Sequence, residues 1–177
     1  MNLQNAANLG TNILIALGDR PTSLDLVRSV AGAIHAPKQT RITLMHYLMP
    51  IYWEHGGEEN DPQALKERLQ EELQVEEDEE DEEQRAQKHF AKAQAILQKV
   101  GVPAANVRTE LAWEEVDAAH AVLDELKRGE YTSVIIGEHD TDFLTRLIDP
   151  PMAEIIRRHA GDVTVWTVPT AEEVIGD

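Results

Sequence analysis

Residues Val134–Pro169 read VIIGEHDTDFLTRLIDPPMAEIIRRHAGDVTVWTVP, and this stretch decides the fold. The apolar strand Tyr131–Ile136 leads into it and closes at Gly137. A helix is predicted from Pro150 to His159, because aspartate followed by proline is a strong helix start. A last strand, Val163–Val168, ends at a proline. A strand, a helix and a second strand in this order predict parallel strands joined by a crossover.

The rest of the chain continues the same alternation. Three further strands are predicted at Asn12–Leu17, Arg41–Tyr47 and Val107–Leu111. Apolar residues at helical spacing predict further helices at Pro21–Ile34, Pro62–Leu73, Phe90–Val100 and Trp113–Lys127, the last with His120 on its inward face. The pattern therefore predicts an α/β fold: one five-stranded parallel sheet with helices on both faces.

Composition supports a single domain. The chain has 177 residues, of which 42% are apolar, enough for one core over residues 12–169. Cysteine is absent, which excludes disulfides and thiol chemistry. Of the net charge of −17, −13 falls between Glu54 and Glu83, where eight acids run without a break from Glu76. We interpret residues 54–83 as an acidic insertion and expect a mobile, solvated segment; a weak cation site or a basic partner is the alternative.

The charge and the apolar runs also bear on partners and location. A net charge of this sign disfavours broad contact with nucleic acid or with an anionic membrane surface. The longest apolar runs are too short to cross a bilayer, and the polar start lacks the features of a signal peptide. We therefore expect a cytoplasmic protein with no nucleic-acid or membrane partner.

Three stretches resemble the universal stress protein family. They are NILIAL at Asn12–Leu17, ITLMHY at Ile42–Tyr47, and Val134–Pro169. The resemblance covers residues 12–169 apart from the acidic insertion. It implies a fold like that of the adenine nucleotide alpha hydrolases with strand order 3-2-1-4-5, a role in stress response, and often a homodimer.

The same resemblance locates a nucleotide pocket and shows that its motif is altered. Nucleotide-binding members carry G-x-x-G-x9-G-[ST] after the fourth strand, and here the four positions are Gly137, Asp140, Pro150 and Pro151. The family's first-strand aspartate aligns with Gly18, one residue before Asp19. The degenerate pocket would be lined by Leu17, Gly18, Asp19, Met45, Gly137, Asp140, Pro150 and Pro151.

Each change in the motif weakens phosphate binding. Proline has no N–H to donate, so Pro150 and Pro151 remove two donors from a helix start. Asp140 adds a negative charge, and two like charges about 4 Å apart repel by about 4 kcal/mol at an effective dielectric constant of 20. We therefore expect no bound cofactor; ATP or AMP with Mg²⁺ in an altered pocket is the alternative.

Other polar residues give little support for catalysis. His139, Asp140 and Asp142, next to Glu138, could ligate a metal, but a solvated turn explains them more simply and we expect no metal. His46 is expected to form a hydrogen bond at the end of its strand. A response-regulator receiver would need clustered acids where Asp19 stands alone. A related nucleotide hydrolase would need a glycine-rich loop after the first strand. We expect a protein that is not an enzyme.

The last strand raises the question of assembly. Val163, Val165, Trp166 and Val168 lie on a strand that the implied order places at the edge of the sheet. Edge strands are commonly covered or paired. Trp166 is therefore either a core residue or part of a dimer interface, and we expect a homodimer that acts through an unidentified protein partner.

Overall fold

Five parallel strands form one sheet, as the sequence pattern predicted, in the order β3-β2-β1-β4-β5 that the resemblance implied. The computed structural model describes residues 9–18, 23–48, 82–113, 118–138 and 152–169. The strands are β1 (Asn12–Leu17), β2 (Arg41–Leu48), β3 (Val107–Trp113), β4 (Ser133–Glu138) and β5 (Thr164–Pro169). Chain order and spatial order differ because β1 lies in the centre, so the connections cross over on both sides of it.

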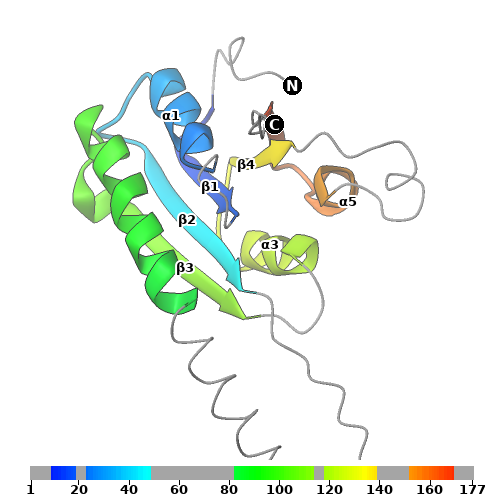
Figure 1. Cartoon of the computed structure of the whole chain (residues 1–177). Helices are drawn as coiled ribbons and strands as arrows, with labels where there is room; N and C mark the ends of the chain where they lie inside the picture. Colours follow the sequence, from blue (N-terminus) through cyan, green and yellow to red (C-terminus); the bar gives the residue numbers. More distant parts are fainter. Residues whose placement is uncertain (1–8, 19–22, 49–81, 114–117, 139–151, 170–177) are drawn as a thin grey trace, which may run out of the picture.

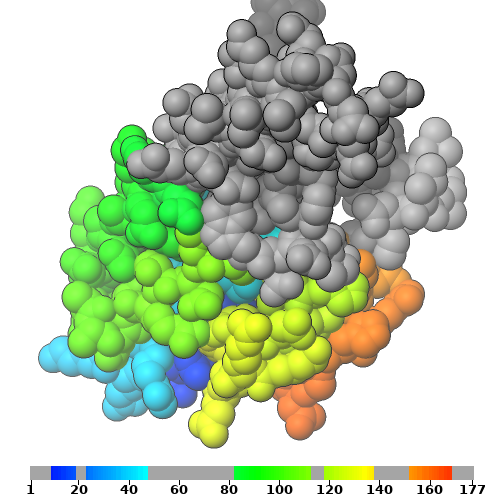
Figure 2. Space-filling view, turned by 90° about the horizontal axis from the view of Figure 1, so that it is seen from below, coloured from blue at the N-terminus to red at the C-terminus, as the bar shows by residue number. Residues whose placement is uncertain are grey.

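Helices cover both faces of this sheet (Figure 1). On one face lie α1 (Ser23–Ala33) and the green helix, which covers residues 82–99 of the described chain. On the other lie α3 (Ala118–Arg128) and α5 (Met152–His159), and a short 3-10 turn, η2 (Ala104–Asn106), precedes β3. Figure 2 shows these elements packed into one body, with the 82–99 helix and α5 on opposite sides.

Each face has its own apolar core. The α1 face contains Ile13, Ile15, Leu44, Phe90 and Trp166, among others. The α3 face contains Leu14, Met45, Val134, Ile136 and Ile156. Neighbouring residues of one strand point to opposite faces, so a strand with both sets apolar is buried on both sides.

The structure corrects several predicted boundaries. Trp113 ends β3 and does not begin a helix, because pairing with Leu48 extends both strands. His120 is exposed, so the predicted inward face of that helix was wrong at this position. The helix predicted from Phe90 already covers Glu82 and Glu83, so the acid run ends in a helix. The predicted helix Pro62–Leu73 and residues 54–81 of the acidic insertion lie outside the described residues.

Phe90 gives a direct test of the α1-face core. Its side chain is only 2% exposed. We expect Phe90→Ala to lower the free energy of unfolding by about 3–5 kcal/mol, because it removes buried apolar area and leaves a cavity. Urea denaturation measures this change, with exposed Lys92→Ala on the same helix as the control. A loss below about 1 kcal/mol for Phe90→Ala would show that the 82–99 helix does not pack as described.

Candidate functional site

The carboxyl edge of the sheet is the candidate site, because parallel α/β sheets bind ligands outside these strand ends. The structure brings the ends of β1, β2 and β4 together there: Leu17 is opposite His46, and Ala16 is opposite both Met45 and Ile136. Gly18 follows β1 and is exposed, while Gly137 lies within β4 and is half-buried. Thus the four predicted pocket residues that the structure describes, Leu17, Gly18, Met45 and Gly137, lie at or near this edge.

Two predicted lining residues point to opposite faces of the sheet. Leu17 belongs to the α1-face core, whereas Met45 belongs to the α3-face core, and both side chains are buried. Met45 pairs with Ala16, the residue before Leu17, and neighbouring residues of a strand point to opposite sides of the sheet. The remaining predicted residues, Asp19, His139, Asp140, Asp142, Pro150 and Pro151, lie outside the described residues.

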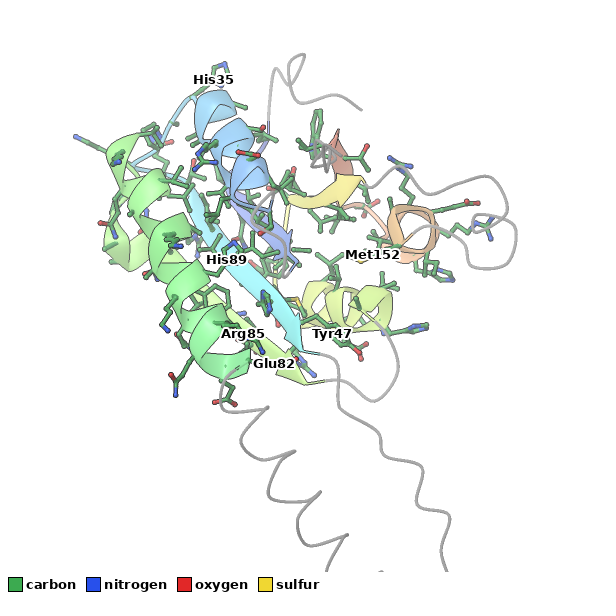
Figure 3. All side chains as sticks on the ribbon, viewed as in Figure 1. His35, Tyr47, Glu82, Arg85, His89 and Met152 are labelled. Atoms are coloured by element: carbon green, nitrogen blue, oxygen red, sulfur yellow. The ribbon has the colours of Figure 1, made fainter. Side chains whose placement is uncertain are left out.

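A buried polar cluster lies beside this edge on the α1 face. His46 of β2 is 2% exposed, and its ring centroid is 6.4 Å from that of His89. Phe90 packs edge-on against His46 at 6.1 Å. His89 Nε2 lies 2.8 Å from Ser23 Oγ, in a hydrogen bond to the first described residue of α1. Figure 3 shows His89 on the inner side of the 82–99 helix, with Glu82, Arg85 and Tyr47 toward the end of β2.

This cluster connects three elements. The Ser23–His89 hydrogen bond joins α1 to the 82–99 helix, and the His46 ring contacts join that helix to β2. Serine hydrogen-bonded to histidine is the arrangement of an activated nucleophile. Ser23, however, is only 6% exposed. The geometry therefore supports a structural role for the pair. Sequence reasoning missed His89, although its spacing from Ala86 and Ala93 places it on the buried face of the helix.

A second polar network lies at the opposite, amino edge of the sheet, on the α3 face. Glu125 of α3 is buried, with a side chain 4% exposed, and it forms an ion pair with Arg108 of β3. The Tyr131 hydroxyl donates to Glu125 Oε1 at 2.5 Å, and its oxygen lies 3.0 Å from Thr43 Oγ1. Thr43 and Arg108 are direct neighbours on β2 and β3. No local sequence pattern indicates this network, since its members are up to 88 residues apart.

The environment of Tyr131 favours its neutral form. Burial of the ring and the hydrogen bond to the Glu125 carboxylate together raise the pKa of Tyr131 from 10.0 to about 12. A phenolate beside a buried carboxylate would place two negative charges together. Tyr131 therefore keeps its proton, and with it the hydrogen bond to Glu125, throughout the neutral range.

The residues predicted for the dimer interface divide between the two cores. Trp166 is 5% exposed within the single chain and donates from Nε1 to Ser133 Oγ at 3.3 Å. Val168 lies in the same α1-face core, while Val163 and Val165 are partly buried against the α3 face. Trp166 and Val168 are thus core residues. β5 itself is the outer strand of the sheet.

No group of three or more histidine, aspartate or glutamate side chains able to hold a metal occurs among the described residues. The predicted metal candidates after β4 lie outside that part of the chain. None of the helices in the described part of the chain is both long enough and apolar enough to cross a bilayer.

Comparison with known proteins identifies the fold. No family model matches the chain, and no curated protein matches its sequence. Solved structures do match. A universal stress family protein from Burkholderia pseudomallei is 18% identical with a TM-score of 0.57, and the match covers 92% of this chain and 98% of that one. A universal stress protein in complex with cAMP is 10% identical with a TM-score of 0.58, over 93% and 100%.

A third structure agrees with these two. The universal stress protein from Archaeoglobus fulgidus in complex with dAMP is 14% identical with a TM-score of 0.51, over 90% of this chain and 98% of that one. The likeness extends over almost the whole length in each case, although identity is low. The chain therefore has the five-stranded fold of the universal stress proteins.

The raised pKa of Tyr131 predicts an alkaline transition. Because the folded pKa exceeds the unfolded value, the stabilisation is complete below pH 10 and is lost as pH rises toward 12. The absorbance of phenolate in the folded protein should show one of its three tyrosines titrating near pH 12 and not near pH 10. Tyr131→Phe should remove that step. Tyr47→Phe is the control. If all three tyrosines titrated together near pH 10, the Glu125 network would be wrong.

Proposed function

We propose that this fold serves a stress-protein role that does not use ATP: a non-enzymatic, universal stress protein-like homodimer that acts in stress response through contacts with another protein. The observation that carries the proposal is the altered motif on a retained fold. Gly137 remains at the carboxyl edge within β4, while the three following motif positions are Asp140, Pro150 and Pro151. The sheet is kept, but the residue types that bind phosphate are not.

The described part of the candidate site also supports a role without catalysis. The serine and histidine that come within hydrogen-bond distance are Ser23 and His89, and they join α1 to the 82–99 helix inside the protein. A nucleophile must reach its substrate, and Ser23 is buried. The pair is thus better suited to hold helices together than to attack a ligand.

Binding of an adenine nucleotide is the alternative. Two structures with this fold are complexes with cAMP and dAMP. Such a ligand would reach the edge formed by Gly18 and Gly137 and would have to tolerate the aspartate and the prolines of the altered motif. AMP carries fewer phosphates than ATP and would suffer less repulsion from Asp140.

Calorimetric titration with ATP and AMP in the presence of Mg²⁺ tests the proposal. We expect no saturable binding to the wild-type chain. The triple variant Asp140→Gly, Pro150→Gly, Pro151→Ser restores the motif and should gain affinity, because it returns backbone donors, a hydroxyl and a neutral residue. Asp162→Gly, on an exposed residue far along the sequence, controls for the loss of one charge. Micromolar binding of ATP to the wild-type chain at one site would overturn the proposal.

The homodimer can be tested at β5. The Thr164 N–H donates to the Thr132 carbonyl on the β4 side, so alternation points the N–H groups of Val165 and Thr167 away from β4, where no strand among the described residues pairs with β5. Val165→Pro removes an outward donor and leaves the β4 ladder intact. We expect light scattering to give a dimer mass for the wild type and a monomer for Val165→Pro, with Val165→Thr as a dimeric control. A monomeric wild type at micromolar concentration would refute the dimer.

A further inference from the structure

A cleft of about 380 Å³ opens at the amino edge of the sheet, opposite the candidate nucleotide site. It lies where β1, β2 and β3 begin and α3 ends. Its charged lining consists of Arg41, Arg108, Arg128, Glu110 and Glu125. Three guanidinium groups and two carboxylates thus line the cleft. The formal charge of its lining is therefore positive, although the protein as a whole has a net charge of −17.

The buried network forms one wall of the cleft. The Glu125 carboxylate forms an ion pair with Arg108 and accepts a hydrogen bond from the Tyr131 hydroxyl, so its negative charge is balanced inside the protein. In return Glu125 holds Arg108, whose side chain remains 58% exposed and faces the cleft. The carboxylate of Glu110 lies 3.9 Å from the Arg108 Nη2 atom, farther away than the carboxylate of Glu125. The arrangement fixes a guanidinium group before any ligand arrives.

Within the described residues, the positive charges of the other two arginines, Arg41 and Arg128, are not used in ion pairs. Asp124 is paired with Lys127 at 2.7 Å, and this hydrogen bond is the main cause of the lowered pKa of Asp124. The positive charge of Arg128 lowers the same pKa from a longer distance. The carboxyl end of α3 adds partial negative charge, which the two basic residues of its last turn offset. Arg41, which begins β2, contributes a full positive charge.

The described end of the acid run, Glu82 and Glu83, does not cancel this charge. Glu83 closes the acid run in the 82–99 helix, and Figure 3 shows its neighbour Glu82 at the other end of the sheet, where β2 finishes. The eight residues of β2 span roughly 26 Å at about 3.3 Å per residue. That distance is about three times the Debye length of about 8 Å at physiological ionic strength, so the charges of Glu82 and Glu83 are screened from the cleft.

We propose that the amino-edge cleft is a second binding site, which takes a small oxyanion of the phosphate class. Guanidinium groups present paired donors that match the oxygens of such an anion. Asn12 and Asn106 stiffen the walls through side-chain hydrogen bonds to the Glu130 and Thr40 carbonyls. The site is separate from the carboxyl edge and holds whether or not a nucleotide binds there.

Titration with inorganic phosphate at constant ionic strength, followed by amide chemical shifts, tests this site. We expect saturable shifts confined to residues 41–43, 105–110 and 125–131. The double variant Arg41→Gln, Arg128→Gln should weaken binding at least about tenfold, since it removes two donors of charge-assisted hydrogen bonds. Both side chains are exposed, so a thermal melt should confirm that the variant folds normally.

The control makes the same change in net charge elsewhere. Lys88→Gln with Lys92→Gln removes two exposed cations from the 82–99 helix and should leave phosphate affinity unchanged. Equal weakening in both double variants would show a nonspecific effect of net charge and overturn the proposal. So would linear, non-saturating shifts in the wild type, or shifts centred on Gly18 and Gly137 at the other edge.

Discussion

The structure depends on the burial of β1 from both sides. Ile13, Leu14 and Ile15 are each 0% exposed, and the strand pairs with β2 on one side and β4 on the other. A strand without solvent on any side must be apolar at consecutive positions, and its neighbours must run parallel, because helices connect them across the faces. The two cores and both edges of the sheet take their positions from this strand.

The two edges of the sheet differ in chemistry. The carboxyl edge carries Gly18 and Gly137, with the histidine cluster packed beside it. The amino edge carries the Glu125 network and the arginine cleft. Parallel strands separate these edges by their whole length. Charged groups at one edge therefore act only weakly on groups at the other.

The local pattern predicted most of the fold. Apolar runs such as Val134–Ile136 and the helical spacing around Phe90 and Leu97 indicated the elements, and the resemblance implied the strand order. Boundaries failed where pairing competed with local periodicity, as at Trp113, which β2 holds in an extended conformation. At the candidate site, the order of strands along the chain did not show that the side chains of Leu17 and Met45 lie on opposite faces of the sheet.

By itself the sequence determined the alternation of strands and helices, the residue types at Gly137, Asp140, Pro150 and Pro151, and the concentration of acid between residues 54 and 83. These depend on neighbouring residues and can be read along the chain. Only the tertiary structure decided that Ser23 meets His89, that Thr43 and Glu125 meet Tyr131, and that Trp166 is a core residue. The physical reason is that a polar side chain becomes buried only when partners from other elements satisfy its hydrogen bonds, and strand order and register choose those partners.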